Sequence, residues 1–337
     1  MTAEAIRTGV WGVGVWGEKH ARVYDALPEA TLVGVYDRDP ERARVVAERH
    51  GCRAFESADA LLEACEAVSI AVPTVEHRAA AERAAAAGRH ALVEKPMAVT
   101  VEEADAMIAA ARSARSALQV GQVERFNPAL LAARPHVRGP KFIEAHRLAL
   151  FQPRSLDVDV VFDLMIHDLD AVLDFVGSPP VALSAVGVAV LSGNEDIANA
   201  RLEFADGCVA NLTASRVSQD RLRRIRFFQG DAYLSVDLFE KTCEMLHVDG
   251  ERLRAILAQG GPAEAGARGA IDRRRLEVAP GEPLALELQA FLGSLRGQGR
   301  GAASAEAGRA ALAVAAEVRA AMKLRARQWA SRTTAAS

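Results

Sequence analysis

From Ile6 to Val120, short apolar and β-branched runs alternate with longer alanine-rich stretches whose apolar positions recur at helical spacing. The runs predict strands and the stretches predict helices. The predicted strands are Ile6–Trp11, Thr31–Tyr36, Ala67–Val72, His90–Val93 and Ala117–Val120. The predicted helices are Glu18–Ala26, Pro40–His50, Val75–Ala87 and Val101–Ala114. Strands that alternate with helices of this length indicate a parallel, doubly wound sheet, so an α/β domain is expected over residues 1–122.

After Val123 the apolar pattern changes mainly to period two, which is typical of half-buried strands. The predicted strands are Lys141–Leu150, Val181–Leu191, Ala198–Phe204, Cys208–Arg216, Ile225–Gln229 and Ala232–Asp237. The predicted helices are Asn127–Pro135, Phe162–Val176, Pro283–Leu295 and Ala303–Gln328. Asp206-Gly207 indicates a tight hairpin, and Gly250–Glu282 is interpreted as a loop excursion. Residues 123–330 are therefore expected to form an α+β domain with an open, mainly antiparallel sheet.

An open sheet of this kind usually buries its exposed face against a second copy, which predicts a homodimer or homotetramer. The formal net charge of −3 over 337 residues gives no support for nucleic-acid binding. The basic runs Arg221–Arg226 and Arg273–Arg275 are interpreted as solvated faces. The N-terminus lacks a signal-peptide pattern, no apolar run reaches 18 residues, and the four cysteines are scattered. We expect a cytoplasmic protein without a membrane segment.

The segment Gly12-Val-Gly14-Val-Trp-Gly17 directly follows the first predicted strand and opens the first predicted helix. Glycines in this position allow a tight turn, close approach of the backbone to a pyrophosphate, and close packing of helix on strand. Asp37 ends the second strand, where a carboxylate accepts hydrogen bonds from the adenosine ribose. The combination predicts a Rossmann domain. A carboxylate at Asp37 would repel a 2′-phosphate, which favours NAD over NADP, although the neighbouring Arg38 is suited to a phosphate.

Two further groups of residues carry candidate chemistry. Glu94-Lys95-Pro96 follows another strand of the same sheet, where a lysine can stabilise charge on a substrate oxygen. Asp163 and His167 lie four residues apart at the start of a predicted helix, and a histidine supported by a carboxylate removes hydroxyl protons near neutral pH. A metal site made of Asp163, His167, Asp168 and Asp170 is disfavoured because Asp168 and Asp170 point to other faces.

In order and spacing, these motifs resemble the Gfo/Idh/MocA oxidoreductase family. Further matches are His20 and Arg22 on the first helix, and the segment containing Ala71, Pro73 and His77. Val160-Val-Phe162 departs from the glycines that many members have there. The resemblance implies hydride transfer between a nicotinamide and a sugar or polyol carbinol carbon. His167 would be the acid/base, Asp163 would orient it, and Lys95 would hold the hydroxyl. The implied cofactor contacts are Gly12, Gly14, Val15, Trp16, Gly17, Asp37, Arg38, Pro73, His77, Glu94, Lys95 and Gln122.

The stretch from Val120 to Pro128, the stretch from His146 to Arg154, and the following Asp157–Val160 are similar to UDP-N-acetylglucosamine 3-dehydrogenases. This resemblance implies oxidation of the sugar 3-hydroxyl to a ketone for a downstream aminotransferase, as in lipid A or surface-glycan biosynthesis. The implied substrate contacts are Lys95, Arg125, Asn127, Arg147, Arg154, Asp163 and His167. Two alternatives stay open: a dehydrogenase of a free sugar or inositol, and a cofactor-binding regulator without catalysis.

Overall fold

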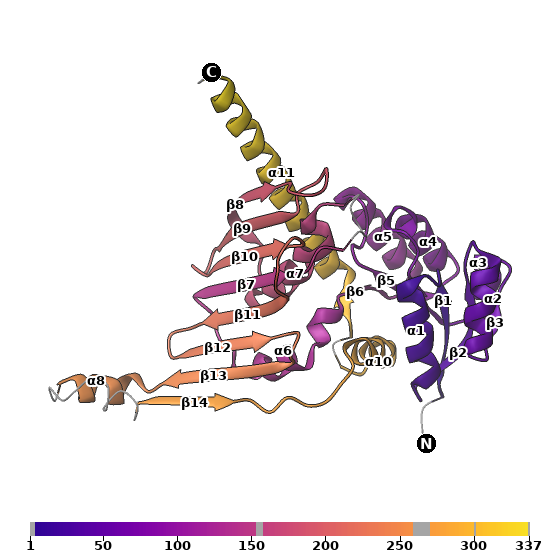
Figure 1. The fold of residues 1–337 in the computed structure, drawn as a ribbon. Coiled ribbons are helices and arrows are strands. Elements are labelled where there is room, and N and C mark those ends of the chain that lie inside the picture. Colours follow the sequence, from indigo (N-terminus) through magenta and orange to yellow (C-terminus); the bar gives the residue numbers. More distant parts are fainter. Residues whose placement is uncertain (1–3, 153–157, 259–269, 300, 336–337) are drawn as a thin grey trace. The chain divides into compact units, whose positions relative to one another are not determined.

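Figure 1 presents the computed structural model of the chain, which describes residues 4–152, 158–258, 270–299 and 301–335. Backbone contacts divide the chain into two compact units. The first comprises Met1–Phe126 and Gly281–Ala313, and the second comprises Asn127–Pro280 and Val314–Ser337. The break between the units after Phe126 lies close to the boundary expected after residue 122. The segment Gly281–Ala313 differs from that expectation, because it packs with the N-terminal unit although it follows the second unit in sequence.

The first unit contains a seven-stranded sheet with the order β15-β6-β5-β4-β1-β2-β3 (Figure 1). Its strands are β1 (Ile6–Trp11), β2 (Ala30–Tyr36), β3 (Arg53–Ala54), β4 (Ala67–Ile70), β5 (His90–Glu94), β6 (Leu118–Gly121) and β15 (Ala303–Ser304). All neighbouring strands are parallel except the short pair of β15 with β6. The strand order reverses between β1 and β4, which confirms the predicted doubly wound sheet.

The helices of this unit begin where the sequence provides caps. They are α1 (Val15–Ala26), α2 (Pro40–Arg49), α3 (Ala58–Ala64), α4 (Thr74–Ala86), α5 (Val101–Ala114), α10 (Pro283–Leu295) and the first part of α11 (Ala305–Ala335). The Asp39 side chain accepts hydrogen bonds from the second and third residues of α2, and the Thr100 hydroxyl accepts one from Glu103. α3 and β3 are absent from the predicted elements, because both are very short.

Helix α10 contributes to the hydrophobic core of the first unit. Leu288 and Phe291 are fully buried in a cluster with residues of β1, α1, β2 and α2. The helix was predicted over the same residues, but its packing partner was not, because periodicity shows which face is apolar and not what covers it.

The second unit contains an eight-stranded sheet with the order β14-β13-β12-β11-β7-β10-β9-β8. Its strands are β7 (Phe142–Leu148), β8 (Pro180–Val188), β9 (Ile197–Phe204), β10 (Val209–Ser215), β11 (Leu222–Phe228), β12 (Ala232–Asp237), β13 (Thr242–Val248) and β14 (Ile271–Arg275). Only β7 and β10 pair in parallel, so the predicted mainly antiparallel sheet is confirmed. The hairpin at Asp206-Gly207 joins β9 to β10, and Gly207 has a φ of +82°.

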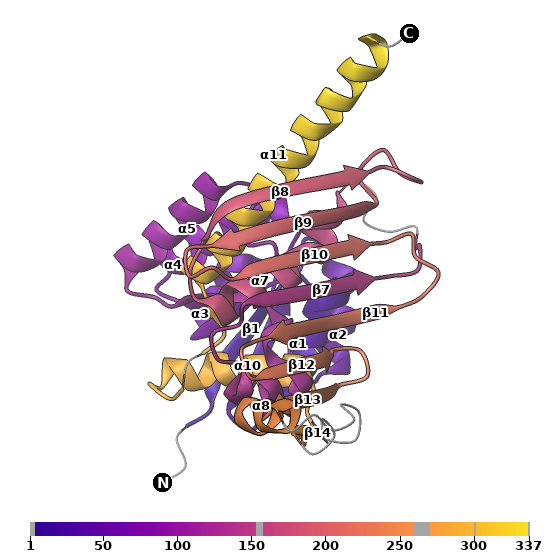
Figure 2. The ribbon, with the colours of Figure 1, turned by 90° about the vertical axis from the view of Figure 1, so that its left-hand side faces the viewer.

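One face of this sheet is covered by α6 (Pro128–Ala133), α7 (Ile166–Val176), which follows a π-helical turn (Val161–Met165), and the second part of α11. Helix α8 (Gly250–Ala258) lies beyond the ends of β13 and β14 (Figure 1), and Figure 2 shows no described helix over the other face of strands β8 to β11. α6 contacts β12 and β13, and α7 contacts β7 and β10. The strands alternate accordingly: every second residue of β9 is buried, and Asn199, Arg201 and Glu203 between them are exposed.

Interpretation of Gly250–Glu282 as a loop excursion was wrong for helix α8 and the edge strand β14, whereas residues 276–282 form neither helix nor strand. Every residue of β14 is exposed, so this strand carries no apolar alternation for a sequence pattern to reveal. In the described residues, no helix is long and apolar enough to cross a membrane. The four cysteines are present as free thiols.

Candidate functional site

The turn between β1 and α1 has the geometry of a phosphate-binding loop. Gly12 has a φ of +86°, and a Cβ atom there would lie 2.8 Å from the backbone nitrogen of Val72. A Cβ atom on Gly17 would lie 1.8 Å from the carbonyl oxygen of Gly12, so α1 can start this close to β1 only with glycine there. Around Gly14 a Cβ atom would meet nothing within 4 Å. Within the described chain no side chain caps α1, which leaves its first N–H groups for an anion.

A pocket of about 400 Å³ opens at the carboxyl ends of β1, β2 and β4, where the strand order reverses. Its lining residues are Trp11, Gly12, Gly14, Val15, Trp16, Tyr36, Asp37, Arg38, Arg42, Ala71, Val72, Pro73 and Glu76. Most of the expected cofactor contacts are therefore in this wall. Gly17, His77, Glu94, Lys95 and Gln122 lie outside it. The glycine turn, the free helix end and a carboxylate in one pocket fit a dinucleotide.

Asp37 is held rigidly in this pocket. Its Oδ2 atom accepts a hydrogen bond of 2.8 Å from the Val13 N–H, and its Oδ1 atom accepts one of 2.9 Å from the Asp39 N–H. The Arg42 guanidinium lies 3.6 Å from the same carboxylate. Arg38 points to solvent, with 75% of its side chain exposed, and pairs with Glu76 at 3.2 Å. The fixed carboxylate suits ribose hydroxyls, whereas Arg38 and Arg42 add positive charge at the rim.

The buried His20 side chain links three elements of the first unit. Its Nδ1 lies 2.9 Å from the Ser69 hydroxyl, and its Nε2 lies 2.9 Å from a Glu94 carboxylate oxygen. The Tyr24 hydroxyl lies 2.9 Å from the same serine oxygen. The other Glu94 oxygen accepts a hydrogen bond from the Lys95 N–H. In this structure, Glu94 and His20 thus position the turn that carries Lys95.

His77 performs a similar structural task. Its ring is 1% exposed, with Nδ1 3.0 Å from the Pro96 carbonyl oxygen and Nε2 2.9 Å from the Val72 carbonyl oxygen. Burial lowers the pKa of this imidazole, which favours the neutral ring that donates from one nitrogen. His77 therefore packs between the turn after β4 and the cis Lys95–Pro96 turn after β5, and its neutral ring donates a hydrogen bond to one of the two carbonyl oxygens. Lys95 is half-buried at the carboxyl end of β5.

Gln122 directly follows β6 and is 2% exposed. Its Oε1 atom is buried and has no hydrogen-bond partner among the described residues. A buried amide oxygen without a partner is costly, and a donor from a ligand would satisfy it. Cofactor binding by Gln122 stays a prediction, and this oxygen is the atom that would accept the hydrogen bond.

Asp163 and His167 lie at the start of the helix that crosses the second sheet. A π-helical turn, Val161–Met165, holds Asp163, and His167 lies in the first turn of α7. The carboxylate of Asp159 fixes this start by accepting hydrogen bonds from the N–H groups of Val161 and Phe162. Asp163 and His167 are partly exposed, whereas most of their neighbours are buried. Among the described residues, no group of three or more His, Cys, Asp or Glu side chains could hold a metal ion.

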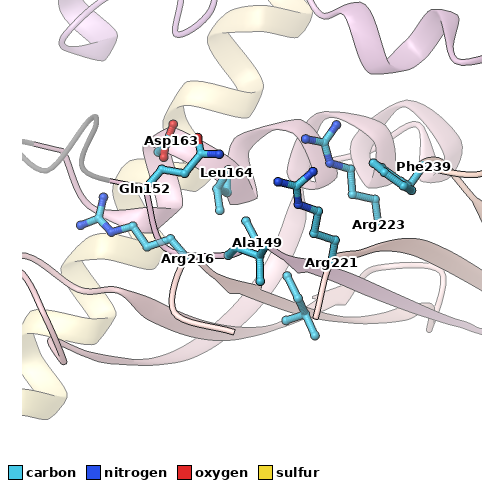
Figure 3. Close-up of a pocket in the computed structure, with 10 residues that line it drawn as sticks. Ala149, Gln152, Asp163, Leu164, Arg216, Arg221, Arg223 and Phe239 are labelled. Atoms are coloured by element: carbon cyan, nitrogen blue, oxygen red, sulfur yellow. The ribbon is translucent and has the colours of Figure 1, made fainter. Parts of the chain in front are cut away.

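Asp163 lines a pocket of about 150 Å³ at the strand ends in the middle of this sheet (Figure 3). The rest of the wall comes mainly from the carboxyl ends of β7 and β10, the start of β11 and Phe239. The lining residues are Leu148, Ala149, Leu150, Gln152, Asp163, Leu164, Arg216, Arg221, Arg223 and Phe239. A pocket with one carboxylate and three guanidinium groups suits a polar, anionic ligand.

Two expected substrate contacts have structural roles in the second unit. Arg147 donates two hydrogen bonds of 2.8 Å to the two carboxylate oxygens of Asp168, and both side chains are 3% exposed. This buried fork joins β7 to α7. Asn127 caps α6 by accepting a hydrogen bond from the Ala129 N–H, and its Nδ2 donates to the Leu238 carbonyl oxygen. In this structure both side chains therefore serve the framework of the second unit, and their contact with a substrate stays a prediction.

Two expected substrate contacts remain, Arg125 and Arg154, and the structure describes only the first of them. Arg125 lies in a 3₁₀ turn (Val123–Phe126) and is half-buried. Arg154, like Asp157, lies outside the described residues.

Sequence reasoning missed Arg221 and Arg223 in the pocket wall, because the whole run was interpreted as a solvated face. In a strand, alternate residues point to opposite faces. Arg224 and Arg226 pair with Asp237 and Glu144 at 2.8 and 2.7 Å, whereas the odd-numbered arginines line the pocket. Period-two analysis of the arginine run would have separated the two sets.

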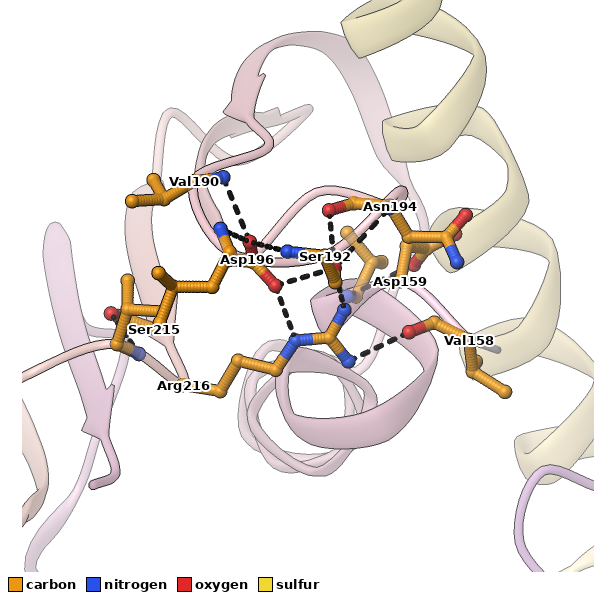
Figure 4. A network of polar contacts seen from close by, with 11 residues as sticks. Val158, Asp159, Val190, Ser192, Asn194, Asp196, Ser215 and Arg216 are labelled. Atoms are coloured by element: carbon orange, nitrogen blue, oxygen red, sulfur yellow. Dashed lines mark hydrogen bonds and ion pairs between the residues drawn. The ribbon is translucent and has the colours of Figure 1, made fainter. Parts of the chain in front are cut away.

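Arg216 is anchored behind this pocket by a network of polar contacts (Figure 4). Its Nε donates to Asp196 at 2.8 Å, and its terminal nitrogens donate to the Val158 carbonyl oxygen and the Ser192 hydroxyl. Asp196 also accepts hydrogen bonds from the N–H groups of Val190, Leu191 and Ser192. Burial raises the pKa of Asp196, but the bonds from Ser192, Leu191 and Arg216 outweigh it and hold that pKa well below its usual range.

The dinucleotide pocket of the first unit fits an oxidoreductase, and comparisons with known proteins agree. Residues 6–122 match the oxidoreductase family with an NAD-binding Rossmann fold, and residues 108–232 match the Gfo/Idh/MocA C-terminal domain. The chain therefore belongs to the Gfo/Idh/MocA family of oxidoreductases, and its first unit contains an NAD-binding Rossmann domain.

Particular members are similar over nearly the full length. UDP-N-acetylglucosamine 3-dehydrogenase of Acidithiobacillus ferrooxidans is 42% identical over 319 residues, which cover 94% of this chain and 97% of that protein. Its crystal structure has a TM-score of 0.85 at 41% identity and covers 95% of this chain and 99% of that one. Inositol 2-dehydrogenase of Rhizobium meliloti is 28% identical over 228 residues, 63% of this chain and 69% of that protein.

Proposed function

We propose that the protein is an NAD-dependent dehydrogenase that oxidises the 3-hydroxyl of a UDP-N-acetylamino sugar, with UDP-N-acetylglucosamine as the preferred substrate. The observation that carries this proposal is the 42% identity to the Acidithiobacillus ferrooxidans enzyme over 94% of the chain. The arginine-lined pocket beside Asp163 agrees with a substrate that carries negative charge.

NAD is proposed as the cofactor because the pocket wall contains the fixed Asp37 carboxylate, which would accept hydrogen bonds from ribose hydroxyls and repel a 2′-phosphate. The N-terminal end of α1 would hold the pyrophosphate, and Gln122 would accept a hydrogen bond at its buried Oε1. When bound, the nicotinamide supplies the hydride acceptor for the carbinol carbon.

The chain's own residues would position the hydroxyl and move its proton. We assign His167 as the acid/base that takes the proton and Asp163 as the residue that orients it. Lys95, at the carboxyl end of β5, would hold the substrate oxygen and stabilise its developing negative charge. Glu94, His20 and His77 would act through the turns that they fix rather than through contact with substrate.

The ketone product would be consumed by an aminotransferase, since transamination places an amino group on a carbonyl carbon and the oxidation supplies that carbonyl at C3. Lipid A or surface-glycan biosynthesis is the proposed context. A homodimer or homotetramer is proposed through the sheet face that carries no described helix. Sedimentation of a monomer at micromolar concentration would contradict the assembly but not the activity.

The test is NADH formation by the purified protein with NAD and UDP-N-acetylglucosamine, with an aminotransferase and an amine donor present to remove the ketone. We expect turnover with the UDP sugar and none with free N-acetylglucosamine. Turnover with inositol or free sugars alone would instead support the second candidate, which the partial match to an inositol dehydrogenase favours.

His167→Asn tests the assignment of the acid/base. We expect a loss of turnover of about 100-fold or more, because general acid–base catalysis contributes about 10²–10⁴-fold. NAD binding, measured by titration calorimetry, should be unchanged. The matched control is His136→Asn, on a turn of the second unit that contacts the carboxyl end of α7 through Arg134 and Asp174, whereas His167 lies in the first turn of that helix. Normal turnover by His167→Asn would reject this assignment.

A further inference from the structure

We propose that Arg221 and Arg223 form a subsite for the diphosphate of the substrate, with Phe239 beside them as the wall for its organic end. This inference rests on the proposed function, which supplies a nucleoside diphosphate as part of the substrate. It assigns the binding of that group to residues other than Arg147 and Asn127.

The strand geometry places both arginines on the helix-covered face of the sheet. Residues 221, 223, 225 and 227 alternate onto one face, where Ile225 and Phe227 are buried in the core. Arg221 and Arg223 are the next positions toward the strand start, beyond the core, and both are exposed. Figure 3 shows their side chains extending from the strand in the same direction, on the Phe239 side of the pocket.

Charge is distributed unevenly around this pocket. Arg216 is 4% exposed and its guanidinium is paired with Asp196 at 2.8 Å, so it serves the framework of the wall. Arg221 makes no ion pair with any described residue. Asp163 is the carboxylate of the wall, and in Figure 3 it lies on the Gln152 side of the pocket, away from Phe239. An anion would therefore be drawn toward the Arg221 side, and the neutral sugar would be left near Asp163.

The arginine side of the pocket is held in place before any ligand binds. The Leu238 N–H donates to the Arg223 carbonyl oxygen at 2.7 Å, and the Leu238 carbonyl oxygen accepts from Asn127 Nδ2 at 2.9 Å. The next residue, Phe239, donates its N–H to Asp237 Oδ1 at 3.0 Å. A preorganised wall lowers the ordering cost of binding. These contacts also give Asn127 a positioning role.

Size and polarity indicate an organic diphosphate rather than free phosphate. The pocket volume of about 150 Å³ is below the roughly 300–1,000 Å³ of pockets that enclose a whole drug-sized ligand. It would therefore hold one part of a long substrate. The Phe239 side chain is 51% exposed at the rim, which is an unusual place for a large apolar group unless it covers part of a ligand.

The experiment is titration calorimetry of the full-length protein with UDP, inorganic pyrophosphate and uridine. The variants are Arg221→Gln, Arg223→Gln and Phe239→Ala. Arg138→Gln is the matched control, because Arg138 is an exposed arginine of the same unit that precedes the amino end of β7, whereas the pocket lies at its carboxyl end.

We expect wild-type protein to bind UDP, to bind pyrophosphate more weakly, and to bind uridine most weakly. Each arginine variant should weaken UDP and pyrophosphate binding by about 10–100-fold, as expected for the loss of a charge-assisted contact. Phe239→Ala should weaken UDP binding alone, and Arg138→Gln should change nothing. In turnover, the arginine variants should raise KM and leave kcat nearly unchanged.

Wild-type affinity for UDP in both arginine variants would overturn the subsite, and so would an absence of UDP binding to the wild type. Equal loss in Arg138→Gln would also overturn it, because the effect would then reflect overall charge. Failure of the proposed function is a separate result: the wild type would bind UDP through these arginines and yet form no NADH with UDP-N-acetylglucosamine.

Discussion

Asp37 is a single carboxylate whose position is set mainly by two backbone N–H groups, with the Arg42 guanidinium 3.6 Å away. Two N–H groups, from Val13 and Asp39, hold its oxygens at 2.8 and 2.9 Å. Since one of these donors belongs to the glycine turn and the other to the start of α2, the negative charge cannot move away from a ligand without disturbing both. A cofactor with an additional phosphate would meet that charge directly.

Asp37→Ser should therefore shift cofactor use toward NADP. Serine removes the charge and leaves a shorter, neutral hydroxyl in place of the carboxylate. We expect the ratio of kcat/KM for NADP to that for NAD to rise by about 10–100-fold, which corresponds to one charge-assisted interaction. Steady-state kinetics with both cofactors measures the ratio. Asp59→Ser, at an exposed pair with Arg83, is the control, and an unchanged ratio in Asp37→Ser would contradict the argument.

At the level of elements, the buried Arg147–Asp168 fork determines how β7 and α7 are joined. Both side chains are 3% exposed, so the pair has lost its hydration and each charge depends on the other. His167 is the residue before Asp168, which means that the fork also fixes the first turn of the helix that carries the proposed acid/base.

Arg147→Met should lower the free energy of unfolding by about 3–5 kcal/mol, because it leaves Asp168 buried and unpaired. The double variant Arg147→Met/Asp168→Leu should recover most of this loss, since two apolar groups replace the two charges. Denaturant unfolding measures both values. Arg201→Met, at an exposed pair with Glu203, should cost less than about 1 kcal/mol. Additive losses in the double variant would contradict a coupled pair.

Elements with a local signal were predicted well, and elements that depend on distant contacts were not. β1, α5, β12 and α10 occupy their predicted ranges, because alternation, caps and proline mark them within the segment itself. β11 was expected from Ile225 but begins at Leu222, since arginines at its start hid the alternation.

The candidate site divides in the same way. The glycine turn and Asp37 could be predicted because a turn and a strand end are local features. The partner of Arg147 could not, because Asp168 lies 21 positions away and only the fold brings the two together. The structural roles of His20 and His77 likewise depend on contacts with other strands and turns. The sequence alone could not predict that Arg221 lines a pocket, because that depends on which face of β11 the helices cover.

For the whole molecule, the Asp196 network connects stability to pH. Burial alone would raise the pKa of Asp196, but hydrogen bonds from Ser192, Leu191 and Arg216 keep it below its ordinary value. The ordinary value for an unfolded aspartate is about 3.9. A carboxyl group with a lower pKa in the folded state stabilises the protein above that value, and its contribution is lost as the pH falls below it.

Asp196→Asn should therefore destabilise the protein by about 3–5 kcal/mol at pH 7, because Arg216 loses its buried partner. The difference between wild type and variant should narrow as the pH falls below about 4. Thermal unfolding at pH 7, 5, 3.5 and 2.5 measures it. Asp231→Asn, at an exposed carboxylate, serves as the control. A difference that stays constant to pH 2.5 would contradict the assignment.

The division of the chain has a consequence for biosynthesis. The first unit requires Gly281–Ala313, so its core lacks the α10 residues Leu288 and Phe291 until most of the chain has left the ribosome. Domains made in one stretch fold as they emerge, N-terminal first. Here the cofactor-binding unit reaches its final core only after the second unit's strands have been synthesised. A gene fragment that stops after Phe126 would encode the glycine turn and Asp37 without the helix that completes their support.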